Sequence, residues 1–263
     1  MLPSMKPYIL LVIHLLFALA IQAQNDYLVS LLNDGEQTDM KDMQFCTIAG
    51  RGLFAMVGNS LVGIDEERNG DFQELSLPDS TYTIEEIVLL PDLFVCKSDS
   101  NILYINKRKR LHGFSLDTDS FHIRYASDST IYILVQDKVF ETKVRGGAPE
   151  LRFEYSNHKI LEYQPVLHNV YVVTEEQLLI KTDEKLVLLL NMPEPIKAVN
   201  ISSHGILIGT QSALFCYDSV GTLRLIEEIP VHQILNDGDY LYVISEDSSI
   251  YRLQREHKKQ AKK

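Results

Sequence analysis

Apolar and polar positions follow one another along this chain in a unit that recurs six times. Each unit holds a short apolar strand, a polar turn of three to five residues and a second short apolar strand. Successive units start 40, 38, 39, 36 and 35 residues apart, at Leu53, Leu93, Ile131, Val170, Ile206 and Leu241. Strands and turns repeated at this spacing predict stacked sheets that bury their faces against one another.

Further strand-like segments, rich in β-branched and aromatic residues, flank each pair. Those that precede it are Met43–Ala49, Thr83–Leu90, Phe121–Ala126, Lys159–Pro165, Ile196–Ile201 and Val231–Leu235. Those that follow it in five units are Phe72–Leu77, Leu111–Leu116, Leu151–Tyr155, Leu186–Leu190 and Leu223–Ile229. Six units of four antiparallel strands predict an all-β fold, a six-bladed β-propeller. The strands of a blade are called A to D, from the centre outward.

The sixth unit has no fourth strand of its own, because the chain after Leu253 is almost entirely polar. At the other end, Asp26–Leu32 has strand character and precedes every inner strand. We therefore expect this N-terminal strand to complete the last blade and close the ring, which removes two exposed sheet edges. Its closure should bury Leu28, Leu31 or Leu32 against that blade.

The first 23 residues have the layout of a secretory signal peptide. Lys6 is followed by the apolar run Tyr8–Ile21, which is shorter than the roughly 20 residues of a membrane span. An uncleaved anchor is the alternative. The expected domains are a signal peptide at 1–23, a single propeller at 24–257 and a basic tail at 258–263. The mature protein would be secreted or periplasmic, with no transmembrane segment after signal removal.

The chain is acidic, with 36 Asp and Glu against 25 Lys and Arg and a formal net charge of −11. This charge repels nucleic acid and anionic lipid, so no nucleic-acid partner is expected. Basic residues concentrate in the tail and in Lys107–Arg110. Both segments are interpreted as solvated, with docking to an acidic partner as the alternative.

The three cysteines, Cys46, Cys96 and Cys216, cannot form a fully paired set because their number is odd. All three fall on expected strands, which predicts that they are buried as small apolar residues. A bridge between Cys46 and Cys96, in neighbouring blades, stays open as an alternative.

One strand–turn–strand segment carries a resemblance to known repeats. Leu214–Leu223 reads Leu-Phe-Cys-Tyr-Asp-Ser-Val-Gly-Thr-Leu, and Ile64-Asp65 followed by Asn69–Phe72 is a looser copy. These segments are similar to repeats of the NHL, TolB and quinoprotein-type propeller superfamilies. The resemblance implies a six-bladed fold and no particular activity. The chain departs from WD-type blades, quinoprotein docking motifs and the sialidase aspartate box, which all depend on tryptophan, because it has none.

Polar residues on the expected inner strands are the candidates for binding a ligand in the central channel. They are Glu86, His122, Arg124, Glu162, Lys197, Asn200 and Gln233. Lactonase-like propellers such as the paraoxonase family hold calcium in this region, but a hard cation prefers six to eight oxygens, and Arg124 and Lys197 would repel it. Ion pairs across a water-filled channel are the alternative. Neither a metal nor another cofactor is expected.

No sequence motif of a hydrolase, a zinc site or a phosphate-binding loop occurs in the chain. We therefore expect a monomeric binding module, without catalysis of its own, that takes a protein, peptide or glycan partner on one propeller face. The alternative is a small-molecule hydrolase of the lactonase or esterase type that uses the channel residues.

Overall fold

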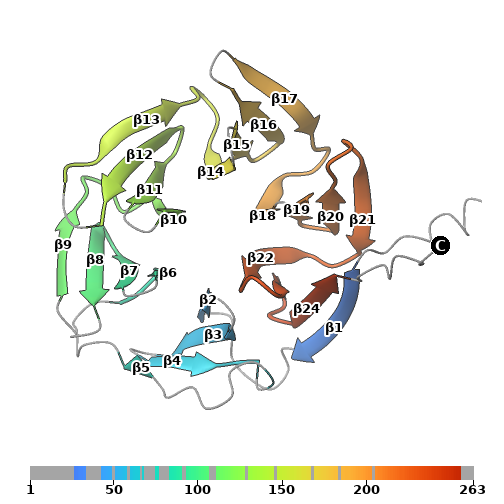
Figure 1. Ribbon diagram of the computed structural model, residues 1–263, viewed down its shortest axis with the longest axis horizontal. Coiled ribbons are helices and arrows are strands. Elements are labelled where there is room, and N and C mark those ends of the chain that lie inside the picture. The colour runs from blue at the N-terminus through green and yellow to red at the C-terminus, as the bar shows by residue number, and fades with distance from the viewer. Residues whose placement is uncertain are drawn as a thin grey trace, which may run out of the picture.

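Six four-stranded sheets form a ring around a central opening (Figure 1). The computed structural model describes residues 27–33, 43–48, 51–57, 60–65, 67, 75–76, 83–90, 93–106, 111–127, 130–144, 147–166, 169–182, 185–202 and 205–255. Within these residues every element is a strand, and all neighbouring strands are antiparallel. The chain is a six-bladed β-propeller, as the repeat predicts.

The strands of each blade follow one another from the centre outward. Blade 1 comprises β2 (Gln44–Ile48), β3 (Gly52–Val57), β4 (Ser60–Gly63) and β5 (Leu75–Ser76). Blade 2 comprises β6 (Glu86–Leu90), β7 (Leu93–Ser98), β8 (Asn101–Asn106) and β9 (Leu111–Ser115). Blade 3 comprises β10 (His122–Ser127), β11 (Thr130–Val135), β12 (Lys138–Lys143) and β13 (Glu150–Glu154). Blade 4 comprises β14 (Ile160–Val166), β15 (Asn169–Thr174), β16 (Gln177–Lys181) and β17 (Leu186–Asn191). Blade 5 comprises β18 (Ile196–Ser202), β19 (Gly205–Thr210), β20 (Leu214–Tyr217) and β21 (Leu223–Glu227).

The N-terminal strand closes the ring, which confirms the prediction. Blade 6 consists of β22 (Val231–Asn236), β23 (Leu241–Ser245), β24 (Ile250–Arg255) and, outermost, β1 (Tyr27–Asn33). The pairing of β1 with β24 runs from Tyr27 opposite Arg255 to Asn33 opposite Ile250. Figure 1 shows β1 beside β24, although more than 200 residues separate them in the sequence.

A shared irregularity identifies β1 as a D strand like those of blades 3, 4 and 5. Each of these four strands has one extra residue relative to its C strand, a β-bulge. The leucine just before the bulge is about half exposed in all four: Leu31 (54%), Leu151 (54%), Leu188 (52%) and Leu225 (48%). The bulge turns the outer strand at the same place in each blade, so the exposure of these leucines follows from the repeat.

The expectation that Leu28, Leu31 or Leu32 is buried is met by Leu32, which is partly buried, whereas Leu31 precedes the bulge and faces solvent. Tyr27 (7% exposed) is buried in the cluster between blades 5 and 6, and Val29 packs against it. Leu32 packs against the cluster between blades 6 and 1. The strand therefore contributes to the core on both of its faces, while the side chain of Leu28 lies outside the described residues.

The core consists of apolar clusters between neighbouring blades, and each of the six boundaries has one. Cys46 and Cys96 are buried together between blades 1 and 2, and Cys216 between blades 5 and 6. All three are free thiols, so no bridge joins Cys46 to Cys96. Burial raises the pKa of both Cys46 and Cys96 to about 12, which keeps them protonated and unreactive.

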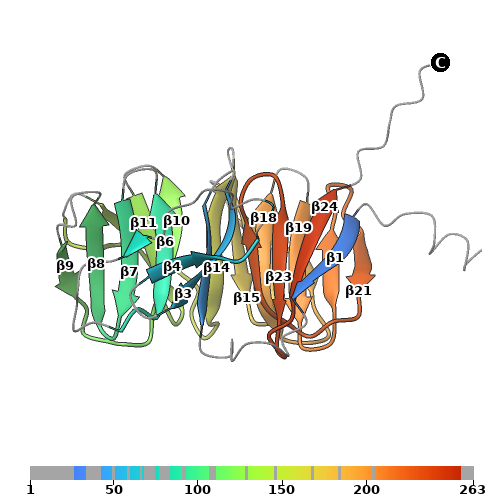
Figure 2. The same cartoon turned by 90° about the horizontal axis from the view of Figure 1, so that it is seen from below.

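Connections between strands lie on the two faces of the ring, which Figure 2 shows from the side. The turns between strands B and C and the loops between strands D and A share one face, because successive strands are antiparallel. Main-chain hydrogen bonds join them there, for example from Met192 N–H to Glu176 O at 2.8 Å and from Glu246 N–H to Pro230 O at 3.1 Å. We call this the D–A face.

Several sequence predictions concern residues outside the described part of the chain. They are the signal peptide at 1–23, the basic tail at 258–263, Lys107–Arg110 and the turn Asn69–Phe72. A search of the described residues finds no helix with the length and apolarity needed to cross a membrane.

Candidate functional site

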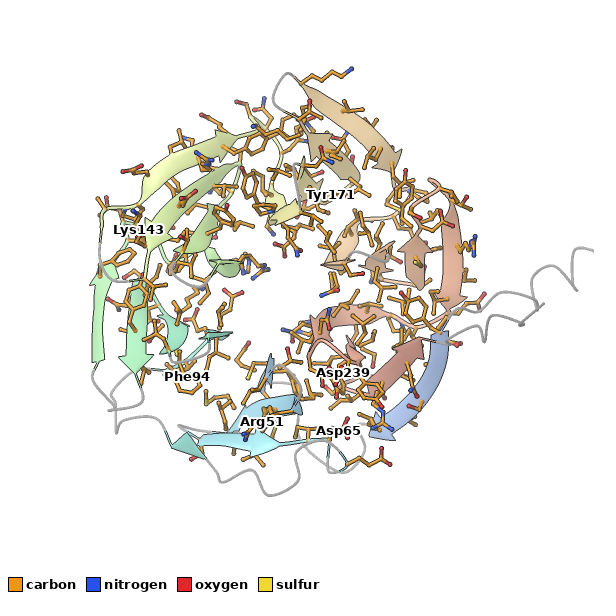
Figure 3. All side chains as sticks on the ribbon, in the orientation of Figure 1. Arg51, Asp65, Phe94, Lys143, Tyr171 and Asp239 are labelled. Carbon is orange, nitrogen blue, oxygen red and sulfur yellow. The ribbon has the colours of Figure 1, made fainter. Side chains whose placement is uncertain are left out.

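The inner strands β2, β6, β10, β14, β18 and β22 surround the central opening, and each has one edge without a neighbouring strand (Figure 1). Figure 3 shows polar side chains around this opening. Main-chain N–H and C=O groups on an open edge need partners from elsewhere when they are shielded from water. The candidate residues of the channel supply many of these partners.

Three candidate residues meet across blades 2, 3 and 4: Glu86 on β6, Arg124 on β10 and Glu162 on β14, here called the inner triad. Arg124 Nη1 donates to Glu86 Oε1, and Arg124 Nε donates to Glu162 Oε2 at 3.0 Å. Ile123 N–H donates to the other oxygen of Glu86 at 2.9 Å, and Tyr163 N–H donates to that of Glu162 at 3.1 Å. One guanidinium therefore holds two carboxylates from neighbouring blades.

The side chains of the triad are 14% to 30% exposed, and burial is the largest influence on the pKa of each of them. For Arg124, the two carboxylates outweigh burial and raise its pKa above the ordinary value. For Glu86, burial is outweighed by Arg124, His122 and the Ile123 N–H, so its pKa is lowered. For Glu162, burial outweighs the single guanidinium, so its pKa is raised. The two carboxylates thus differ in how firmly they hold a proton.

Amide and hydroxyl side chains make similar links at other blade boundaries. Gln164 Nε2 donates to a main-chain carbonyl of β18 at 3.2 Å. Between blades 6 and 1, Thr47 Oγ1 donates to Asn236 O at 2.7 Å, and Gln233 Nε2 lies 3.5 Å from Phe45 O. Polar side chains of the inner strands therefore join blades as well as line the opening.

The structure places the seven candidates in two groups. Glu86, Arg124 and Glu162 form the triad, and His122 lies beside it with Nδ1 3.7 Å from Glu86 Oε2. Lys197, Asn200 and Gln233 lie on the inner strands of blades 5 and 6: β18 carries the first two, and β22 the third. Asn200 Oδ1 is buried and has no hydrogen-bond partner among the described residues.

The sequence analysis did not predict two features of the inner wall. The first is the role of the candidates as partners for open main-chain edges, which residue type does not reveal. The second is a β-bulge near the start of β18 and β22, which makes Lys197 and His232 the extra residues and leaves both exposed. Aligning the six A strands by their B-strand partners would have exposed this shift in register.

The described residues contain no group of three or more His, Cys, Asp or Glu placed to hold a metal ion. Within the triad, the position between the two carboxylates is taken by Arg124. The triad can bind a proton, because its single guanidinium balances only one of the two carboxylates.

The D–A face has a different character, because its loops are strongly acidic. Nine loops and turns of this face are fully described, and Lys159 is the one lysine or arginine in them. They are residues 99–100, 116–121, 136–137, 155–159, 175–176, 192–195, 211–213, 228–230 and 246–249. The carboxylates there number ten: Asp99, Asp117, Asp119, Asp137, Glu175, Glu176, Glu194, Glu228, Glu246 and Asp247. Lys159 pairs with Glu175 at 3.4 Å, so these nine described loops and turns contain no lysine or arginine for the other nine carboxylates.

An open groove of about 530 Å³ lies at the blade 2 part of this face. Its lining residues are Asp99, Ser100, Leu116, Asp117, Thr118 and Asp119. The Leu116 N–H donates to Ser100 O at 2.8 Å, which fixes the loop after β9 against the turn after β7. The groove is thus a shallow, open and acidic depression of the surface rather than an enclosed cavity.

Comparison with known proteins supports the fold and leaves the family open. No protein-family model matches the chain, and no curated protein matches it. Among solved structures, a catalytically inactive virginiamycin B lyase from Staphylococcus aureus with quinupristin is similar at 12% identity and a TM-score of 0.59, over 87% of this chain and 99% of that one. All such likenesses are too distant in sequence to show more than the propeller fold.

Two further structures illustrate how varied the proteins with this architecture are. The extracellular domain of a one-component system from B. thetaiotaomicron is 15% identical with a TM-score of 0.55, over 76% of this chain and 31% of that one. A chain of the Mitotic Checkpoint Complex is 10% identical with a TM-score of 0.59, over 86% and 90%. An enzyme, an extracellular domain and a component of a protein complex thus share the fold.

The opposite pKa shifts of the triad predict unequal effects of removing its charges. Glu86→Gln should destabilise the protein by about 1.5–3 kcal/mol, the usual contribution of a hydrogen bond to a charged group. Glu162→Gln should cost less than about 1 kcal/mol, because burial already disfavours its charge. Urea unfolding of both variants at pH 7.5 checks this. Equal losses of unfolding free energy in the two variants would show that Glu86 and Glu162 contribute equally to stability.

Proposed function

We propose that this protein is a secreted or periplasmic binding module that engages a protein or peptide partner on its D–A face and has no catalysis of its own. The observation that carries the proposal is the contrast between the two candidate regions. Polar groups of the inner wall such as Arg124 and Gln164 are engaged in joining blades, whereas the nine fully described loops and turns of the D–A face present ten carboxylates with one lysine among them.

Charge complementarity favours a partner with basic residues over a neutral glycan. Such a surface attracts cationic segments, raises their association rate and repels acidic ones. Extracellular and complex-forming proteins among the structural neighbours are compatible with this role. The groove beside Asp117 and Asp119 offers a place for an extended chain on this face.

Charge reversal on the D–A face tests the proposal. The variant Asp117→Lys, Asp119→Lys, Glu176→Lys should bind a fluorescent oligoarginine peptide at least about tenfold more weakly than the wild type at low salt. The matched pair is Asp117→Lys alone and Asp239→Lys on the opposite face, which change the net charge equally; Asp117→Lys should weaken binding and Asp239→Lys should change it little. Fluorescence anisotropy at 50 and 300 mM salt provides the measurement. Equal loss in the two single variants, or tighter binding of an oligosaccharide than of the peptide, would contradict the assignment.

The hydrolase alternative makes an opposite prediction about the channel. Calcium-dependent esterase or lactonase activity that Glu86→Gln or Glu162→Gln abolishes would overturn the binding-module proposal. A panel of aryl esters and lactones, with and without added calcium, decides between the two.

A further inference from the structure

The inner triad contains one carboxylate more than its single guanidinium can neutralise. Arg124 bonds to Glu86 on one side and to Glu162 on the other, from three neighbouring inner strands. The charged groups that act on Glu162 are Arg124 and Glu86. Among the strands packed beside β14, β11 and β15 have no charged residue, and Lys197 on β18 is exposed. The other two are β10, with His122 and Arg124, and β12, with Lys138, Glu141 and Lys143.

Each carboxylate accepts one hydrogen bond from Arg124 and one from a main-chain N–H, but the two differ in the neighbouring imidazole and in exposure. Glu86 receives bonds from Arg124 and the Ile123 N–H and has His122 at 3.7 Å. Glu162 receives Arg124 at 3.0 Å and the adjacent Tyr163 N–H at 3.1 Å. Its side chain is also less exposed, at 14% against 21% for Glu86. When the triad takes up a proton, the geometry therefore directs it to Glu162.

We infer that Glu162 is a proton-responsive joint between blades 3 and 4. At neutral pH its carboxylate is paired with Arg124. When the pH falls through the raised pKa of Glu162, this carboxylate takes one proton from solvent, Arg124 remains bound to Glu86, and the excess negative charge of the triad disappears. The joint then changes from an ion pair to a hydrogen bond between a neutral carboxyl group and a guanidinium, so the inner wall stays connected.

The direction in which stability changes with pH follows from the linkage between protonation and folding. The folded protein binds the proton of Glu162 more tightly than the unfolded chain does, because its pKa lies above the ordinary value of 4.5. Stability from this group therefore rises as pH falls through the raised pKa towards 4.5. Glu86 has a lowered pKa, so its contribution is present above 4.5 and is lost only at lower pH. Between neutral pH and about 4.5, the triad as a whole gains stability.

Thermal unfolding of the full chain at pH 7.5, 6.5, 5.5 and 4.8 tests the inference. The wild-type Tm should rise relative to that of Glu162→Gln as the pH falls, by at most about 2–4 °C per pH unit for one linked proton. Glu86→Gln should keep a pH-dependent gain, and Glu175→Gln, on the surface, should follow the wild type. If Tm plotted against pH gives parallel curves for the wild type and Glu162→Gln, the inference is overturned.

A second measurement does not depend on the stability of any variant. The side-chain carboxyl ¹³C shift of Glu162, followed by NMR in wild-type protein, should titrate with a midpoint above 4.5, and that of Glu86 with a midpoint below it. A Glu162 midpoint at or below 4.5 overturns the inference even if the variants unfold too readily for melting curves. Because neither readout involves a partner, a failure here leaves the proposed binding function untouched.

Discussion

Removal of residues 25–33 is expected to give a protein that is aggregated or partly opened. These residues include β1, the outer strand of blade 6, which pairs with β24 along its whole length. Its loss would expose the edge of β24, and an unprotected edge strand pairs readily with other chains. It would also withdraw Tyr27, Val29 and Leu32 from the two clusters that flank blade 6.

The size of the effect follows from the buried side chains and the lost strand pairing. Burying one large apolar side chain contributes about 1.5–3 kcal/mol, and Tyr27 is 7% exposed. Together with the lost strand pairing, this is a large share of a typical stability of about 5–15 kcal/mol. Size-exclusion chromatography and thermal unfolding of the deletion variant, beside a deletion of 258–263 as control, provide the measurement. Identical melting of the N-terminal deletion and the full chain would refute closure by β1.

Point substitutions on β1 refine this experiment because its two faces differ. Tyr27→Ala should destabilise the protein by about 3–5 kcal/mol, as for other buried aromatic residues. Leu31→Ala should cost less than about 1 kcal/mol, since Leu31 is 54% exposed. Comparable losses in the two variants would mean that the bulge does not direct Leu31 to solvent.

The architecture could be predicted from the sequence because the hydrophobic period is repeated in every blade. A spare strand at Asp26–Leu32 and a missing one after Leu253 then left a single way to close the ring. The burial of individual leucines on that strand could not be predicted, because the sequence does not show where the bulge interrupts the strand alternation. Leu31, next to the bulge, is exposed, although Tyr27 and Val29 on the same side of the alternating strand pack against the core.

The inner wall could be predicted only as a set of polar residues around an opening. Glu86, Arg124 and Glu162 were selected because they are charged residues on expected A strands. Their mutual contact depends on how neighbouring blades are turned, and their bonds to main-chain groups such as Ile123 N–H leave no trace in residue type. The acidity of the D–A face is visible in the sequence only after each loop has been assigned to a face.

Ring closure also depends on a buried polar network between blades 6 and 1. Asp65, whose side chain is 1% exposed, accepts a hydrogen bond from Tyr242 Oη at 2.8 Å. Arg252 Nη1 lies 3.3 Å from both Asp65 oxygens and 2.8 Å from Glu67 Oε2. Because Arg252 is on β24, opposite Ser30 of β1, the network joins the closing strand pair to blade 1.

Loss of the Asp65 charge should therefore weaken the closed ring strongly. Asp65→Asn leaves Arg252 without its buried partner, and breaking a buried pair in this way costs about 3–5 kcal/mol. Glu67→Gln is the matched control on the same guanidinium. Its side chain is 76% exposed, so its loss should cost less than about 1 kcal/mol. Urea unfolding midpoints of the two variants measure the difference. If Asp65→Asn unfolds at the same urea concentration as Glu67→Gln, the network does not stabilise closure, and β1 would then hold the ring through strand pairing and apolar contacts alone.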